Sequence, residues 1–219
     1  MDKAFSTQYP QFAYLSADQQ KRIHQASLEI LHTMGVYVYD SGALDIFRSA
    51  GARIEDGGLV FIPPAMVEDA VSSTPTSVTL FDRSGDSALR LSKGNVYFGP
   101  GSDCLYIHDH RTEEHRRGTL QDVEDIARLC DALPNIDFLM SGIVPSDVSS
   151  ERANLLQMMV MMKNSTKPIM FVTNDFHSSV KNVEAAETIA GGETQLKEKP
   201  YICCYINVTD PLRHNQESL

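Results

Sequence analysis

The chain has 219 residues, of which 42% are hydrophobic and 22% are charged, and its formal net charge at pH 7 is −10. This composition is that of a globular protein with enough apolar residues to form a core, and it excludes a disordered tail or a fibre. The acidic balance also argues against nucleic acid as a partner, because phosphate binding depends on clustered Lys and Arg.

Further features of the sequence bear on where the protein is located. No run of about 18 apolar residues occurs, so the sequence predicts no membrane span. The first residues lack the apolar segment of a secretory signal, and the four cysteines do not form the pattern of a disulfide framework. We therefore expect a cytoplasmic protein whose thiols are reduced. Its partner is expected to be a small molecule or another protein.

The N-terminal region is predicted to mix short helices and strands. A helix is expected over 16–34, because Ser16 and Gln19 form a capping box, apolar residues recur at helical spacing, and Gly35 follows. The remaining predicted elements are a short strand over 36–39, helices over 41–50 and after Pro63, a hairpin around 56–58, and β segments over 78–81, 88–91, 96–98 and 105–107.

From Thr119 onward, helices and apolar strands are predicted to alternate. Phe138, Ile169 and Tyr201 mark successive strands about 31 residues apart. Strands of this kind are apolar on both faces, which indicates a parallel sheet with helices outside it. The predicted helices cover 119–133, 150–163 and 178–190, and the predicted strands cover 136–140, 168–172 and 201–206.

The spacing of these units favours part of a barrel over a small open sheet. A (β/α)₈ barrel has about 250 residues, or roughly 31 per unit, and the segment 135–219 is long enough for fewer than three complete units. The predicted fold class is therefore α/β, with a mixed α+β region over 1–134. This mixed region is followed, over 135–219, by the first three β/α units of a TIM-type (β/α)₈ barrel, which is incomplete in this chain.

Several stretches resemble a known family, in the same order along the chain. The chain is similar to the N-terminal part of the trimethylamine methyltransferase family, whose corrinoid-dependent members demethylate methylamines and quaternary amines such as betaines. The resemblance covers about 15–212, and members of the family are roughly twice as long. The similar stretches are 23–31 (IHQASLEIL) with 34–36 (MGV), 61–67 (FIPPAMV), 97–101 (YFGPG) and 131–138 (DALPNIDF).

The resemblance implies a barrel that holds a methylated amine at the carboxyl ends of its strands. It also implies a separate corrinoid protein whose Co(I) accepts the methyl group. A quaternary ammonium leaves as a neutral amine, so the enzyme mainly has to bind the cation, exclude water and align the methyl group. We expect this chain to bind no cofactor tightly, because the cobalt corrinoid is carried by the partner. We also expect a homo-oligomer without a membrane partner.

The first candidate substrate-binding residues follow the predicted strands, where barrel enzymes place their chemistry. Asn174 follows the second strand, and Asn207 and Asp210 follow the third. Their side chains could form hydrogen bonds to an amine substrate, and an aspartate could also balance its charge. The alternative is that these residues cap the helices that come next. The same two interpretations apply to Asp147 and Asp175.

A second candidate is the segment that contains Tyr97, Phe98, Gly99 and Gly101. Aromatic faces attract quaternary ammonium groups, and glycine lets the backbone approach a ligand closely. The alternative is a tight turn with ordinary core aromatics. The sequence assigns no residue a catalytic role.

Other conspicuous patterns are interpreted structurally. Cys104, His108, His110 and His115 are possible zinc ligands by type, but the arginines among them favour an exposed hairpin turn, and no metal site is predicted. Cys203 and Cys204 alternate faces of a strand and are expected to be buried. The methionines at 158, 159, 161 and 162 cover most of a helix, which indicates core packing with a subunit contact.

Two functional hypotheses follow. The leading one is the N-terminal portion of a corrinoid-dependent methylamine or quaternary-amine methyltransferase, inactive as an isolated fragment. The alternative is a non-catalytic short homologue that binds a small molecule or a partner.

Overall fold

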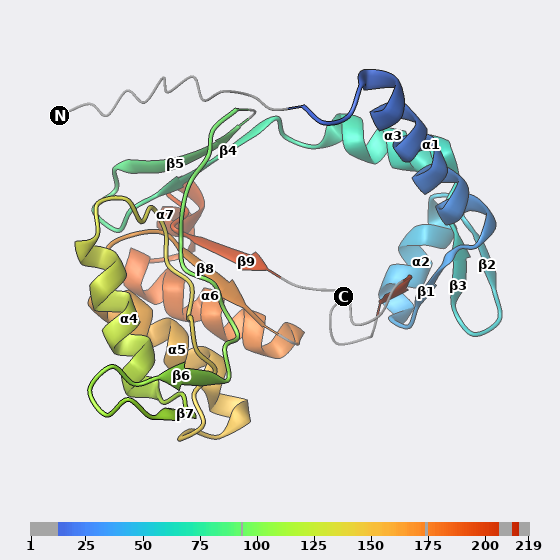
Figure 1. The fold of residues 1–219 in the computed structure, drawn as a ribbon. Helices are drawn as coiled ribbons and strands as arrows, with labels where there is room; N and C mark the ends of the chain where they lie inside the picture. Colours follow the sequence, from blue (N-terminus) through green and yellow to red (C-terminus); the bar gives the residue numbers. More distant parts are fainter. Residues whose placement is uncertain (1–12, 93, 174, 206–211, 215–219) are drawn as a thin grey trace. The chain divides into compact units, whose positions relative to one another are not determined.

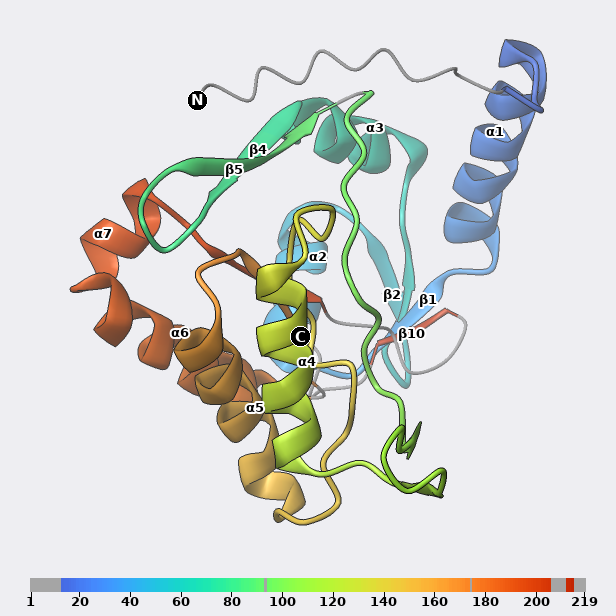
Figure 2. The same ribbon diagram turned by 60° about the vertical axis from the view of Figure 1, so that its left-hand side comes forward.

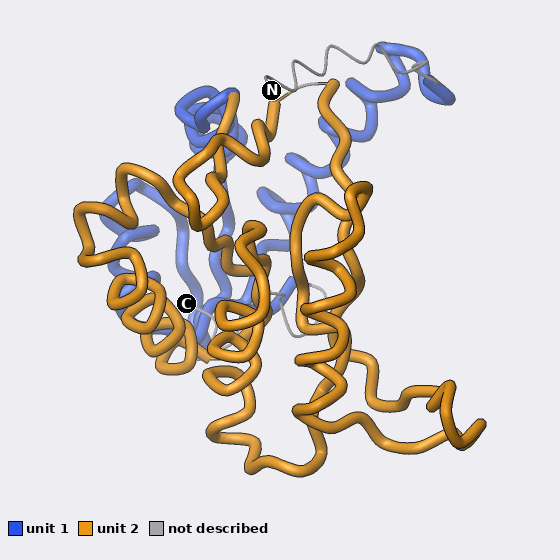
Figure 3. The backbone as a smooth tube through the Cα atoms, turned by 90° about the vertical axis from the view of Figure 1, so that its left-hand side faces the viewer, with its two compact units in different colours: residues 1–76, 208–219 blue, residues 77–207 orange. Residues whose placement is uncertain are grey.

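A computed structural model describes residues 13–92, 94–173, 175–205 and 212–214 (Figure 1). The architecture is mixed α/β, as the sequence predicts. The chain divides into two compact units, residues 1–76 with 208–219 and residues 77–207 (Figure 3). The division at residue 134 that the sequence suggests stays a prediction. No helix in the described part of the chain is long and apolar enough to cross a membrane.

The first unit contains a small sheet with the strand order β10-β1-β3-β2. Strand β3 pairs antiparallel with both β1 and β2, whereas β10 pairs parallel with β1. The core of this unit consists of Val36, Val38, Ala52 and Val60. Its elements are α1 (Ala17–Thr33), β1 (Val36–Val38), α2 (Ser41–Ser49), β2 (Arg53–Glu55), β3 (Leu59–Phe61), α3 (Pro64–Ser73) and β10 (Arg213–His214).

The predicted start of the first helix is confirmed. Ser16 Oγ accepts a hydrogen bond from Gln19 N at 3.3 Å, and Gln19 Oε1 accepts one from Ser16 N at 2.8 Å. The predicted hairpin around 56–58 is also confirmed. Gly58 has a φ of +82°, and a Cβ there would lie 2.3 Å from the carbonyl oxygen of Val38. Only glycine fits this position, for reasons of both conformation and space.

The second unit begins with two β-hairpins, β4 (Ser77–Phe81) with β5 (Ser87–Ser92) and β6 (Tyr106–His108) with β7 (His115–Arg117). The strand predicted over 96–98 is wrong, because these residues form a loop without sheet pairing. This loop is held instead by side chains: Tyr97 Oη accepts a hydrogen bond from Arg90 N at 2.8 Å and donates one to Arg90 O at 3.2 Å.

The second unit continues as alternating helices and parallel strands. Strands β8 and β9 pair in parallel, with Ile169 opposite Ile202 and Val172 opposite Tyr205. The strand predicted over 136–140 is reduced to a single parallel bridge between Leu139 and Ile169. The elements are α4 (Leu120–Ala132), α5 (Ser150–Asn164), β8 (Ile169–Val172), α6 (Phe176–Ala190), α7 (Glu193–Glu198) and β9 (Ile202–Tyr205).

The core of the second unit lies between these strands and the helices, which stack side by side in the order α4, α5, α6 (Figure 2). Ile169 and Phe171 face the helices, where they meet three methionines of α5 that are at most 1% exposed, Met158, Met161 and Met162. Core packing is thus confirmed for these three. Met159 differs, because 50% of its surface is exposed.

Candidate functional site

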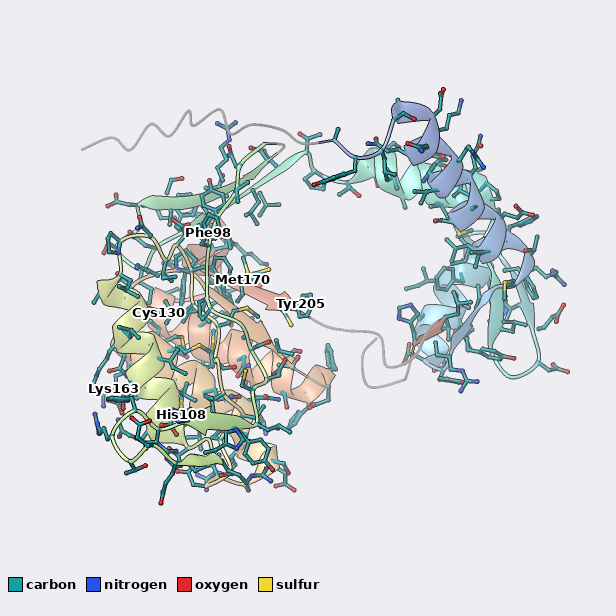
Figure 4. All side chains as sticks on the ribbon, viewed as in Figure 1. Phe98, His108, Cys130, Lys163, Met170 and Tyr205 are labelled. Atoms are coloured by element: carbon teal, nitrogen blue, oxygen red, sulfur yellow. The ribbon has the colours of Figure 1, made fainter. Side chains whose placement is uncertain are left out.

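The pairing of the parallel strands defines a sheet face on the side opposite the helices. Side chains alternate along a strand, so Met170 and Val172 point away from the helix-facing Ile169 and Phe171. The parallel register places Cys203 beside Met170 and Tyr205 beside Val172. Figure 4 labels Met170 on β8 and Tyr205 at the end of β9. We call this the apolar sheet face. Phe138 and Met140 belong to it because they flank Leu139, which pairs with Ile169. Its other members are Met170, Val172, Cys203 and Tyr205.

The loop that contains Phe98, Gly99 and Gly101 is built against the first strand position of this sheet. Phe98 N donates a hydrogen bond to Asp137 Oδ2 at 2.8 Å, and Asp137 N donates to Phe98 O at 2.6 Å. Further along, Gly142 N donates to Gly101 O at 3.1 Å. These contacts hold the loop alongside the first strand position, with Phe98 beside its amino end at Asp137 and Gly101 beside its carboxyl end at Gly142.

Gly99 provides the closest approach between this loop and the sheet. A Cβ at Gly99 would lie 2.3 Å from Cε2 of Phe138, so the backbone of the loop rests directly on the phenyl ring. The space around Gly101 is open by comparison. The ring of Phe98 is 60% exposed, so its face is available to a ligand.

The two neighbouring aromatic residues therefore have different surroundings. The hydroxyl of Tyr97 is bound to the backbone of Arg90, and its ring is half-buried. This geometry favours a structural role for Tyr97 and leaves Phe98 as the aromatic side chain available to a cation. A substrate-binding role for either residue stays a prediction.

The other substrate-binding candidates, Asn174, Asn207 and Asp210, lie outside the described residues. Two aspartates considered with them are described, and both cap helices. Asp175 accepts hydrogen bonds from the backbone N and the Oγ of Ser178, each at 2.7 Å, and these bonds lower the pKa of its carboxyl. Asp147 accepts a hydrogen bond from Leu120 N at 2.9 Å. The predicted capping of the next helix is confirmed for Asp175, whereas Asp147 binds the start of the preceding helix α4 instead.

A polar cluster that the sequence did not predict lies at the carboxyl ends of β8 and β9. Thr173 Oγ1 is 2.5 Å from Ser179 Oγ, and each oxygen is 3.8 Å from Cys204 Sγ. Thr173 is 3% exposed, whereas Cys204 is exposed. The expected burial of Cys204 is therefore wrong, although the two cysteines do point to opposite faces. The cluster was missed because it joins a strand end, a helix turn and a second strand.

The helix face that carries Ser179 continues this polar character. Asn182 lies one turn further along α6, is 1% exposed, and neither of its amide atoms has a hydrogen-bond partner in the described ranges. Buried amides are normally paired. Together with Thr173 and Ser179, it makes the contact between α6 and the ends of β8 and β9 unusually polar for a packed helix–sheet interface.

The histidine-rich segment forms the exposed hairpin that the sequence predicts. His108 lies in β6 and His115 in β7, and the His115 ring stacks on Tyr106 with ring centroids 5.1 Å apart. Among the residues that the structure describes, no three His, Cys, Asp or Glu groups are arranged to hold a metal ion. Arg116 of this hairpin pairs with Asp122 of α4, so the hairpin anchors that helix.

The stretches singled out in the sequence belong to a recognised family pattern. The family model described as trimethylamine methyltransferase (MTTB) matches residues 2–219. The chain belongs to the trimethylamine methyltransferase family. This confirms the resemblance on which the sequence-based expectations of activity and substrate rest.

Individual members of the trimethylamine methyltransferase family show how much of the protein the chain represents. A trimethylamine methyltransferase from Desulfitobacterium hafniense strain DCB-2 is 31% identical over 202 residues, which cover 92% of this chain and 41% of that protein. A glycine betaine methyltransferase from strain Y51 of the same species is 30% identical over 212 residues, covering 96% and 44%. A trimethylamine methyltransferase from Methanosarcina mazei is 27% identical, covering 92% and 42%. The chain thus spans less than half the length of these relatives.

Proposed function

We propose that this chain is the N-terminal portion of a methyltransferase that moves a methyl group from a methylated or quaternary amine to the Co(I) corrinoid of a partner protein. The observation that carries the proposal is the family match over residues 2–219. The relatives named for trimethylamine and for glycine betaine support a small methylated amine as the substrate. A cytoplasmic location and a homo-oligomeric state belong to the same proposal.

The parallel arrangement of Leu139, β8 and β9 supports the barrel part of the proposal. In a (β/α)₈ barrel the helices cover the outside, and the substrate binds at the carboxyl ends of the strands. We assign the apolar sheet face to the barrel interior. In the sequence, Asn174 follows the second predicted strand, and Asn207 and Asp210 follow the third. The loop with Phe98, Gly99 and Gly101, anchored by Tyr97, lies alongside the first strand position and reaches its carboxyl end at Gly101.

The chemistry requires little proton transfer from this chain. A quaternary ammonium departs as a neutral tertiary amine, so the protein has to bind the cation, exclude water and hold the methyl group in line. The corrinoid, when its carrier protein is bound, supplies the nucleophile that accepts the methyl group. The exposed face of Phe98 suits a cation.

Amine-dependent methylation of free Co(I) cobalamin, followed by absorption spectroscopy, tests the proposal. The product of the whole reading frame that contains this chain is expected to demethylate glycine betaine or trimethylamine, and the 219-residue chain alone is expected to be inactive. Absence of transfer from both amines by the whole product, with either amine still bound, would favour a non-catalytic binding protein instead.

Substitution of Phe98 tests the cation site within the same protein. Phe98→Leu keeps an apolar side chain but removes the aromatic face, and it is expected to weaken amine binding about threefold to tenfold. Phe98→Tyr serves as the matched control and should bind as the parent does. Equal affinities of all three proteins in titration calorimetry would remove Phe98 from the site.

A further inference from the structure

A separate cavity of about 420 Å³ lies on the helix side of the second unit. Its walls come from α5, from α6 and from the turn between β4 and β5, and this volume falls within the range of small-molecule sites. The apolar sheet face lies on the other side of the strands, so this cavity is distinct from the candidate amine site. Among the described residues, none that lines this cavity belongs to the apolar sheet face or to the loop of Phe98, Gly99 and Gly101.

The interior of the cavity is apolar. Its inner boundary includes Met162, which is 1% exposed, and its sides include Leu156 and Val160 from the same helix. Met159 and Ile189 border it and remain 50% and 47% exposed. Two large apolar side chains that remain half exposed around a concave apolar surface are typical of a site that a ligand completes.

Two cations lie at one end of this cavity. Lys163 is in the last turn of α5 and forms no hydrogen bond or ion pair in the described part of the chain. Arg83 donates Nε and Nη2 to the carbonyl oxygen of Ser165, at 2.9 Å and 2.6 Å, which places its guanidinium at the same end of α5. Among the residues that the structure describes, no carboxylate lines the cavity. Asp131 binds Ser165 Oγ at the same end of α5, so two cations lie near one carboxylate there.

The apolar length of the cavity follows the axis of α5. Leu156 and Lys163 are two helical turns apart, which corresponds to about 10 Å along the axis. The surface therefore offers an apolar track that ends at two positive charges. A molecule that complements it has an aliphatic chain of medium length with one anionic end.

We propose that this cavity binds a small amphiphilic carboxylate, with its head group at Lys163 and Arg83 and its aliphatic chain along Leu156, Met159 and Ile189. Burial of the ligand's aliphatic chain supplies most of the binding free energy, and the two cations determine the orientation of the ligand. The helix C-terminus is a further reason for cations at this position. An ordinary role in helix capping predicts no ligand binding, so the two explanations differ in a measurable way.

Methyl-labelled methionine NMR of the 219-residue chain tests this proposal with sodium decanoate as the probe. The methyl signals of Met159 and Met162 are expected to shift with saturation, whereas that of Met34, which is 61% exposed in the first unit, stays in place. Decyltrimethylammonium is expected to bind more weakly, because it carries the opposite charge. Lys163→Gln should weaken decanoate binding about threefold, and Lys21→Gln, in α1, should leave the binding unchanged.

Three results would overturn the proposal. The first is the absence of any shift of Met159 and Met162 at decanoate concentrations below micelle formation. The second is a parallel shift of Met34, which would indicate detergent-like association with the whole surface. The third is equal binding of the anionic and cationic probes, which would leave an apolar cavity without a head-group site. Lys163 is exposed at the surface, so Lys163→Gln is expected to leave the fold intact.

Discussion

Arg116 and Asp122 form a two-point ion pair that joins the β6–β7 hairpin to α4. Arg116 Nη1 is 2.8 Å from Asp122 Oδ2, and Nη2 is 2.9 Å from Oδ1. The same carboxylate accepts hydrogen bonds from the backbone N and the hydroxyl of Thr119, at 2.8 Å and 2.7 Å. Arg116 also donates Nε to Asp109 at 2.9 Å. The hairpin is thus attached to the start of the helix through one guanidinium.

Replacing this carboxylate should destabilise the second unit substantially. Asp122 is 6% exposed, so Asp122→Asn removes the buried one of the two carboxylates that pair with the half-buried Arg116 guanidinium and leaves it with Asp109. We expect the free energy of unfolding in urea to fall by about 2–4 kcal/mol. Asp125→Asn is the matched control, because Asp125 lies on the exposed side of the same helix; its effect should stay within about 0.5 kcal/mol. Equal losses in the two variants would show that the ion pair contributes little.

The same network predicts a pH dependence of stability. Hydrogen bonds from Arg116 hold the pKa of the Asp122 carboxyl well below its usual range, and the backbone N–H of Arg111 together with Arg116 lowers the pKa of Asp109. In the unfolded chain both groups have a pKa of about 3.9. Their contribution is therefore complete above about pH 5 and is lost as the pH falls through and below 4. The difference in unfolding free energy between the parent and Asp122→Asn should shrink between pH 7 and pH 3; a constant difference contradicts this assignment.

Gly99 should tolerate no side chain. A Cβ at this position would lie 2.3 Å from the Phe138 ring, so Gly99→Ala has to displace either the ring or the loop. Overpacking of this kind costs about 1–3 kcal/mol, which thermal unfolding should detect. Gly101→Ala is the control in the same loop, because a Cβ there meets no atom within 4 Å. Destabilisation by Gly101→Ala as large as that by Gly99→Ala would show that the loop backbone, and not the ring contact, limits substitution.

Strand β9 should make the isolated chain associate. In the described part of the chain it pairs only with β8, so its second edge offers unpaired backbone groups. Light scattering is expected to give a mass above the 24.3 kDa of one chain. Tyr205→Lys places a charge on this edge, at a residue that is 52% exposed, and should reduce association, whereas Tyr14→Lys should not. A stable monomer of the unmodified chain contradicts the prediction.

Local signals in the sequence determined most of the regular structure. The capping residues Ser16 and Thr119 and the helical spacing of apolar side chains predicted α1, α4, α5 and α6 within a few residues. Continuous apolar runs predicted β8 and β9 and their parallel pairing. Each of these features depends on residues that are close in sequence, where propensity and periodicity act directly. Family membership is likewise a property of the sequence, because it rests on the order of short stretches.

Tertiary contacts decided which segments pair and which distant side chains meet, because local sequence signals carry no information on either. Residues 96–98 have the composition of a strand but lie in a loop, because Tyr97 binds the backbone of Arg90 and no partner strand is available. The contact of Gly99 with Phe138 and the cluster of Thr173, Ser179 and Cys204 join residues from separate segments. Strand β10 pairs with β1 although the two strands lie near opposite ends of the sequence. A sequence pattern reports which side chains are apolar or polar, but packing in three dimensions selects which distant residues meet.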